Sequence, residues 1–176
     1  MTTHNPGGRS TPGSLTTHPS TTHGPRPYRL NVPLRWSDQD AYGHVNNVRL
    51  LTLTEEARVR AAQAWGEWSD GDVMRFVRSM TTEYEAPVRY GPELTARVWV
   101  SGIGRTSYTL HHELWQEGRR CLVSDAAMVV VDAVTARPVP HSDARRALLE
   151  AVLIVPEDGG PDPDDDRAGD GSGGAA

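Results

Sequence analysis

The hydrophobic pattern of the chain changes its period twice, and this order of periods restricts the possible folds more than any other property. Residues 28–36 alternate between apolar and polar side chains, which predicts a half-buried strand. From Asn47 to Trp65 apolar residues recur every three or four positions, which predicts a helix that ends at Gly66. Alternation then returns for about 60 residues. One strand, one long helix and a run of strands indicate an α+β fold.

Turn residues divide the later alternation into further predicted strands. These strands are expected at 84–90, 94–100, 108–114 and 121–131, separated by Gly91-Pro92, Gly102 to Gly104 and Glu117-Gly118. Strands joined by such short turns pair in antiparallel fashion. Pro33 places the first strand at a sheet edge or a bulge, and Asp143 is expected to cap a short helix over 144–152. The pattern therefore predicts a five-stranded antiparallel sheet and one long helix.

The predicted helix is too narrow to cover such a sheet. A helix over residues 47–65 is about 28 Å long, and the apolar face of five strands is wider than one helix. An uncovered strand edge also invites pairing with another chain. We therefore expect sheets from two copies to associate in a homodimer, or in a tetramer formed from two such dimers.

Composition separates the two ends of the chain from its middle. Residues 1–26 are mostly Thr, Ser, Gly, Pro and His, and residues 157–176 are mostly Asp, Gly, Pro and Ala. Neither end can bury enough apolar surface to fold. We expect a disordered N-terminal extension (1–26), one folded domain (27–156) and a disordered acidic tail (157–176). The net charge of −5 belongs almost wholly to the tail, so the domain lacks the basic balance of a nucleic-acid-binding protein.

Residue usage excludes several classes of site. All 18 basic residues are Arg, so there is no Schiff-base or P-loop lysine. The single cysteine, Cys121, cannot form an intrachain disulfide or a Cys-rich zinc site, and it is expected to pack as a small buried hydrophobe. No stretch approaches the roughly 20 apolar residues of a membrane span, and the N-terminal segment has no apolar signal-peptide core. A cytoplasmic location is the expectation.

The densest group of reactive side chains is WSDQDAYGHVNN, residues 36–47, between the first predicted strand and the helix. At a helix N-terminus the first N–H groups lack intrahelical partners and the helix dipole adds positive charge. Such a position stabilises an oxyanion, and a nearby carboxylate completes an acyl-transfer site. Two alternatives stay open. The first is that Asp38 or Asp40 only caps the helix. The second is that these acids and His44 ligate a metal; this second alternative is the less favoured, because no further ligand has suitable spacing.

The run RWSDQDAYGHVNNVRLLTLTEEAR, residues 35–58, resembles the signature of hotdog-fold acyl-CoA thioesterases of the 4-hydroxybenzoyl-CoA thioesterase type. The runs YEAPVRYGPEL, GIGRTSYTL and VVVDAVTARPVP resemble strands of the same family, so the similarity covers about residues 28–141. It implies the hotdog fold, a five-stranded antiparallel sheet wrapped around one long central helix. It also implies hydrolysis of an acyl-CoA to a free acid and CoA, with CoA as part of the substrate and no other cofactor.

The resemblance also implies roles for individual residues. Asp40 matches the catalytic carboxylate, and Asn47 matches the position whose backbone N–H polarises the thioester carbonyl. Glu56 is a second candidate, because some hotdog thioesterases use a helix glutamate instead. The loop that lets the substrate approach is matched by Gly43, His44, Val45 and Asn46.

The phosphates of such a substrate need cations, and only arginine is available. Arg89 and Arg105 lie next to predicted strand ends and are candidate phosphate ligands; a solvated strand face is the alternative. Arg58 is expected to pair with Glu55 at the i,i+3 spacing. Two other functions remain open: a non-catalytic acyl-CoA-binding hotdog protein, and an acyl-thioester hydratase or dehydratase that uses Asp40 with His44. A serine triad is not expected, since no Gly-x-Ser-x-Gly elbow occurs.

Overall fold

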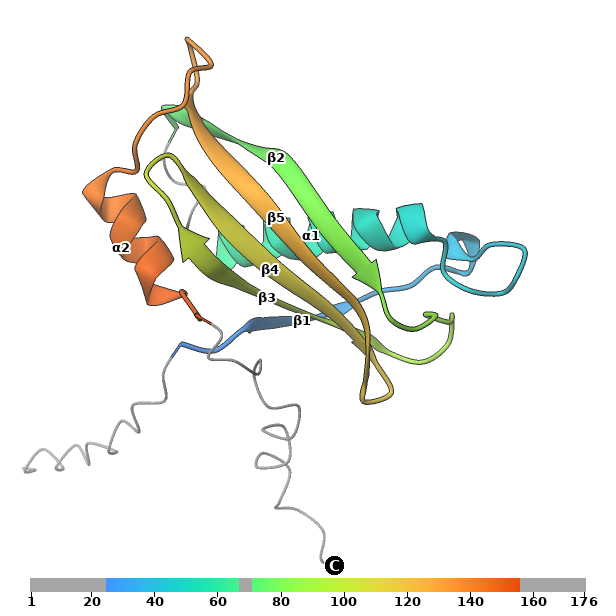
Figure 1. Ribbon diagram of the computed structural model, residues 1–176. Helices are drawn as coiled ribbons and strands as arrows, with labels where there is room; N and C mark the ends of the chain where they lie inside the picture. The colour runs from blue at the N-terminus through green and yellow to red at the C-terminus, as the bar shows by residue number, and fades with distance from the viewer. Residues whose placement is uncertain (1–24, 67–70, 156–176) are drawn as a thin grey trace, which may run out of the picture.

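The computed structural model describes residues 25–66 and 71–155 (Figure 1). The expected disordered ends, 1–26 and 157–176, lie almost wholly outside the described residues and stay predictions. The elements in chain order are β1 (Tyr28–Val32), the 3-10 helix η1 (Trp36–Asp38), α1 (Asn47–Ala64), β2 (Val73–Tyr84), β3 (Leu94–Ile103), β4 (Ser107–Gln116), β5 (Arg119–Asp132) and α2 (Asp143–Ala151). The five strands form one antiparallel sheet in the order β1-β3-β4-β5-β2, which confirms the predicted α+β class.

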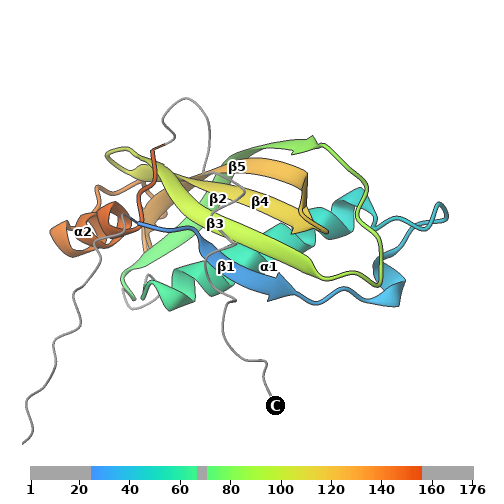
Figure 2. The ribbon, with the colours of Figure 1, turned by 90° about the horizontal axis from the view of Figure 1, so that it is seen from below.

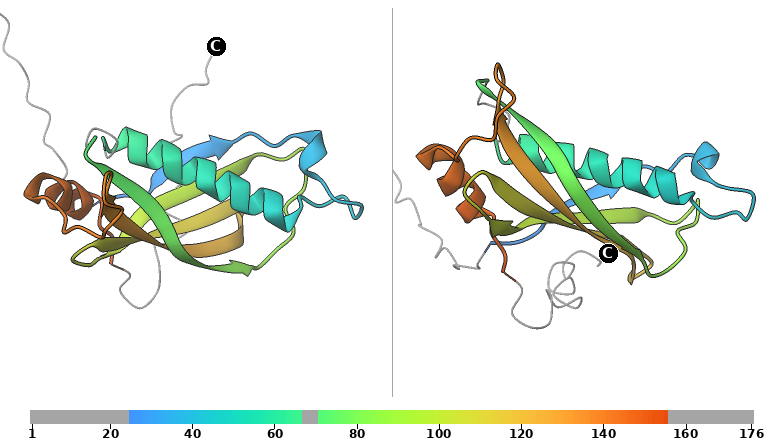
Figure 3. Two further views of the ribbon diagram at one scale, coloured as in Figure 1. Left: turned by 90° about the horizontal axis from the view of Figure 1, so that it is seen from above. Right: turned by 45° about the horizontal axis from the view of Figure 1, so that its top comes forward.

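Helix α1 lies along one face of this sheet (Figure 3). Its buried residues Leu50, Leu53, Ala57 and Ala61 recur at spacings of three and four, and they share one core with inward-facing residues of the strands. The principal contacts of α1 are with β3, β1 and β4. The helix therefore lies nearer the β1 side of the sheet than the β2 side, and α2 covers the far end of β3 (Figure 2).

The two edges of the sheet differ in length and exposure. β1 ends at Val32, so Pro33 follows the paired register and the predicted edge position of this strand is confirmed. β2 is 12 residues long and pairs with β5 alone. Four of its apolar residues, Met74, Phe76, Val77 and Tyr84, are exposed, whereas Val73 and Met80 are partly buried against the core. The long edge of β2 is thus the more open of the two.

Two expected elements are misplaced. The strand predicted at 84–90 is wrong, because β2 ends at Tyr84 and a loop follows. β2 itself shows little alternation, since it is an edge strand whose register shifts between Val77 and Ser79. The C-terminal helix begins one residue early, and its N-cap is Ser142, whose side chain accepts a hydrogen bond from Arg145 N.

Cys121 is buried, as predicted, and its burial raises the pKa of the thiol. It therefore packs as a small apolar side chain and is not a reactive thiolate. Among the described residues, no helix is long and apolar enough to cross a membrane.

Candidate active site

The segment between β1 and α1 folds into a compact loop that is closed by its own backbone. Asp40 N donates to His44 O at 2.7 Å, and Asn46 N donates to Asp38 O at 2.9 Å. Gly43 has φ of +75°, in the left-handed region that glycine adopts without steric cost. The loop projects at the N-terminal end of α1 (Figure 1). Sequence-predicted residues 40–47 are therefore brought together at the start of the helix.

The carboxylate of Asp40 is held by one of its two oxygens. Oδ1 accepts hydrogen bonds from Tyr42 N at 2.8 Å and from His44 N at 3.2 Å. Within the described part of the chain, no group donates to Oδ2. The side chain is partly buried. Asp40 is thus oriented by backbone amides while one oxygen remains available for water or substrate.

Asp38 has a different task. It is buried, its Oδ2 accepts from Arg35 N at 2.8 Å, and its backbone carbonyl accepts from Asn46 N. These bonds close η1 and shape the loop. The alternative that Asp38 or Asp40 caps α1 is wrong, because the N-cap of α1 is Asn46.

The start of α1 leaves a backbone donor open. Asn46 Oδ1 accepts from Val48 N at 2.9 Å, and the first helical bond runs from Leu50 N to Asn46 O. Asn47 N has no acceptor among residues 25–66 and 71–155. Tyr84 Oη donates to Asn47 O at 3.4 Å and so joins the end of β2 to the start of the helix. The Asn47 N–H is therefore a free donor at the positive end of the helix dipole.

Arg89 lies near this loop in the structure. Val45 N donates to Val88 O at 2.8 Å, which fixes the loop after β2 against the Asp40 loop. Arg89 follows directly, and its side chain is exposed. Sequence reasoning missed Gln116, whose buried amide bonds to the backbone of Arg89 and Pro92. Its signal was a polar residue at an apolar position of the β4 alternation.

Two other candidates do not join this group within one chain. Glu56 is exposed, forms an ion pair with Arg60, and lies about 13 Å along the axis from Asn47. Arg105 lies in the turn after β3, at the end of that strand away from Leu94 and so about 30 Å from the loop that carries Arg89.

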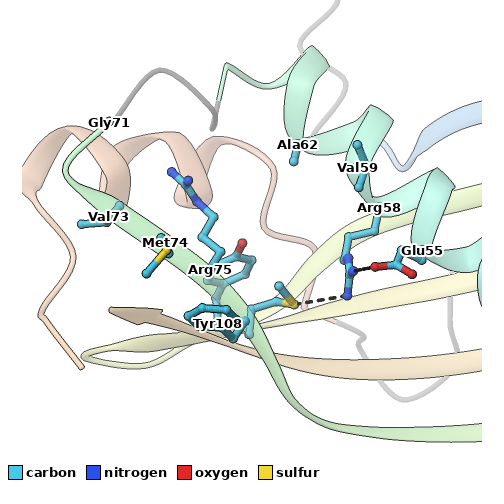
Figure 4. Close-up of a pocket in the computed structure, with 11 residues that line it drawn as sticks. Glu55, Arg58, Val59, Ala62, Gly71, Val73, Met74, Arg75 and Tyr108 are labelled. Atoms are coloured by element: carbon cyan, nitrogen blue, oxygen red, sulfur yellow. Dashed lines mark hydrogen bonds and ion pairs between the residues drawn. The ribbon is translucent and has the colours of Figure 1, made fainter. Parts of the chain in front are cut away.

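A pocket of about 520 Å³ lies between α1 and β2, on the side of the sheet that the helix occupies (Figure 4). Its lining is mainly apolar, with Val59, Ala62, Val73 and Met128 among the contributors. Arg58 reaches into it from α1, with Nη2 at 3.0 Å from Glu55 Oε1, which confirms the predicted pair. The volume is typical of pockets that enclose a small molecule.

Acids, histidines and cysteines do not gather into a metal-ligand group in the described ranges, where no cluster of three or more is found. His111 and His112 are adjacent in β4 and so face opposite sides of the sheet. His112 is buried towards the helix, whereas His111 pairs with Asp125 at 2.9 Å.

A carboxylate loop at the N-terminus of a helix that packs on a five-stranded antiparallel sheet is the arrangement of a hotdog-fold thioesterase. Residues 34–151 match the sequence profile of the thioesterase-like superfamily. That match covers most of the chain, and the protein belongs to this superfamily. Membership supports thioesterase activity in general terms.

Individual proteins resemble this chain in sequence, and two of them also in fold. The chain is 29% identical to protein PA5185 of Pseudomonas aeruginosa. The two structures match with a TM-score of 0.65, and the match covers 73% of this chain and 97% of that one. It is 30% identical to a thioesterase of Thermus thermophilus that was solved in complex with coenzyme A and zinc. The TM-score is 0.61, and the match covers 70% of this chain and 92% of that one. It is also 31% identical over 121 residues to YsmA of Bacillus subtilis, an uncharacterized protein, which covers 67% of this chain and 82% of that one.

Proposed function

We propose that the protein is an acyl-CoA thioesterase, a hydrolase that converts an acyl-CoA to a free acid and CoA. The observation that carries the proposal is that one loop holds both groups needed for the reaction. These are the Asp40 carboxylate, which has one oxygen open, and the free N–H of Asn47 at the start of α1. The similarity to a thioesterase that was crystallised with coenzyme A supports this choice of thiol.

Asp40 acts in one of two ways. As a general base, it removes a proton from a water molecule whose oxygen attacks the thioester carbon. As a nucleophile, its own oxygen attacks that carbon, CoA leaves as the thiolate, and water hydrolyses the resulting mixed anhydride. In both routes the tetrahedral oxyanion accepts a hydrogen bond from Asn47 N–H. A thiol with a pKa near 8.5 leaves without strong acid assistance.

The rest of the loop admits the substrate to these groups. Gly43, His44, Val45 and Asn46 form the approach to the helix start, and the Asn46 side chain occupies Val48 N–H so that the neighbouring donor stays free. Arg89 is the proposed phosphate ligand, because it is exposed and directly follows Val88, whose carbonyl accepts a hydrogen bond from Val45 N of the loop. Glu56 remains the second candidate carboxylate, and within one chain it lies about 13 Å along the helix axis from Asn47.

We further propose a homodimer in which the edges of two β2 strands pair in antiparallel fashion. Pairing about the middle of the strand sets Tyr84 of one copy beside Val73 of the second. The Asp40 loop of one copy would then adjoin two features of the other copy. These are the pocket between α1 and β2, which Val73 lines, and the end of the sheet that carries Arg105. In this assembly α1 is the central helix around which the joined sheet wraps, and the acyl group enters the pocket of the second copy. A cytoplasmic location completes the proposal.

Thiol release from a panel of short, long and aromatic acyl-CoAs tests the activity. A thiol-reactive dye should report saturable release from at least one member. Binding of acyl-CoA without release would contradict hydrolysis and favour a binding protein. A change of acyl mass by one water with the thioester intact, seen by mass spectrometry, would favour a hydratase or dehydratase.

A further inference from the structure

A second pocket, of about 600 Å³, opens on the opposite side of α1 from the first. It is lined by Asn31–Leu34 at the end of β1, Tyr90–Leu94 at the start of β3, and Arg60. Arg60 lies two residues from both Arg58 and Ala62, which line the first pocket, so it points about 200° away around the helix. The second pocket therefore lies at the β1 side of the sheet. Pairing through β2 would leave it open.

The turn that forms one wall of this pocket is held rigidly. Gln116 Oε1 accepts from Arg89 N at 2.9 Å, and Gln116 Nε2 donates to Arg89 O at 2.9 Å and to Pro92 O at 3.2 Å. The amide that makes these three bonds is buried. Gly91, with φ of +124°, closes the turn between the two anchored residues. The backbone on both sides of Tyr90 is thus anchored.

The exposed groups of this turn match the parts of an adenine nucleotide. Tyr90 is 47% exposed and offers an aromatic face on which a base can stack. Arg89 is exposed, and no side chain of the described residues pairs with it, so its guanidinium is available for phosphate. Glu93, in the pocket wall, is an acceptor that suits the exocyclic amino group of adenine.

The turn is also close to the reacting groups. Val88 O accepts a hydrogen bond from Val45 N of the loop. Tyr90 follows Val88 by two residues, so the Cα atoms of Val88 and Tyr90 are at most about 7 Å apart. A ligand on Tyr90 therefore lies beside the loop that holds Asp40, and a flexible arm can join the two places. Such a ligand shape, a nucleotide joined to a thioester by an arm, is that of an acyl-CoA.

Resting on the proposed thioesterase function, we propose that the pocket beside Tyr90 binds the nucleotide end of coenzyme A. Arg89 contacts phosphate, the Tyr90 ring stacks on adenine, and Gln116 positions both by fixing the turn. The thiol carrier of the substrate is then coenzyme A itself, and an acyl carrier protein does not replace it.

Two thioesters with the same acyl group test this assignment, one of CoA and one of pantetheine, which lacks the nucleotide. The measured quantity is the ratio of kcat/KM for acyl-CoA to kcat/KM for acyl-pantetheine. Tyr90→Ala and Arg89→Ala should each lower this ratio by about tenfold, and Tyr90→Phe should keep the wild-type ratio because the ring remains. Arg137→Ala is the matched control, since Arg137 is also exposed but lies in the loop after β5.

An unchanged ratio in Tyr90→Ala and Arg89→Ala would overturn the proposal. So would a wild-type enzyme that prefers an acylated carrier protein or hydrolyses acyl-pantetheine as efficiently as acyl-CoA. Calorimetric titration with free coenzyme A separates this proposal from the proposed function. If no thioester is hydrolysed but Tyr90→Ala weakens coenzyme A binding about tenfold, the pocket assignment stands and the hydrolase assignment fails.

Discussion

Asn46 and Asn47 have different roles at the start of α1. The side chain of Asn46 satisfies Val48 N–H, and the backbone of Asn47 keeps its own N–H free. Sequence reasoning placed the reactive residues in this segment, because a helix start with an acidic loop has a recognisable pattern. It named Asp38 or Asp40 as a possible cap, whereas the cap is Asn46. Asp and Asn cap helices about equally well, so residue type alone does not choose between them.

Replacement of the cap separates stability from chemistry. Asn46→Ala should lower the free energy of unfolding by about 1 kcal/mol, because Val48 N–H loses its acceptor. Asn46→Asp should retain most of that stability, since a carboxylate also accepts at this position. Urea denaturation of the three proteins measures the effect. Equal destabilisation by Ala and Asp would show that the hydrogen bond to Val48 is not the cause.

His112 should make stability depend on pH. Its Nδ1 lies 3.3 Å from Ser124 O, and because a carbonyl only accepts, Nδ1 carries the proton. Burial lowers the pKa of His112 from 6.5 to about 4. As pH falls below 6.5 the unfolded chain binds a proton that the folded chain does not bind until about pH 4. The free energy of unfolding should therefore decrease by up to about 3 kcal/mol across this window and level off below it.

The comparison of wild type with His112→Gln isolates this effect. Urea denaturation at pH 7 and at pH 4.5 should show a smaller loss of stability in the variant, which lacks the titrating group. Identical losses in the two proteins would mean that other groups account for the acid sensitivity.

At the scale of elements, alternation predicted β3, β4 and β5 but misplaced β2. The three inner strands have one face in the core, so their apolar residues alternate. β2 has a bulge and is exposed along much of its length, so burial imposes no such pattern on it. The segment 84–90 alternates for a different reason. Val88 is buried where the loop meets Val45, and no strand is needed to bury it.

The turn over residues 89–92 depends on one buried side chain. Gln116→Ala should lower the free energy of unfolding by about 1–3 kcal/mol, because three hydrogen bonds to the backbone of Arg89 and Pro92 are lost. Amide exchange at Arg89, which donates to Gln116 in the wild type, should become faster. Unaltered protection of that amide in the variant would contradict the anchoring role.

At the scale of the whole molecule, the helix covers part of the sheet and leaves the β2 edge open. The width of the predicted sheet already favoured association of two copies, but only the strand order identifies which edge is long and uncovered. That order depends on pairing between residues distant in sequence, such as Tyr84 with Leu122, which local periodicity does not specify.

A charge on the β2 edge tests the proposed dimer. Phe76 is 49% exposed, so Phe76→Asp should disturb the single chain little while it weakens pairing of two β2 strands. Sedimentation equilibrium should show a dimer for wild type and mostly monomer for the variant. Val134→Asp, at a position 92% exposed in the loop after β5, is the control and should remain dimeric. A Phe76→Asp protein as dimeric as wild type would place the interface elsewhere.

The rate of thiol release by Asp40→Asn tests the central claim most directly. Asn can accept the bonds from Tyr42 N and His44 N, so the loop should keep its shape while the base or nucleophile is lost. On the best acyl-CoA of the panel, kcat should fall by at least about a hundredfold with KM little changed. Asp125→Asn, on the opposite face of the sheet, should keep the wild-type rate. Near-normal turnover by Asp40→Asn would contradict the account.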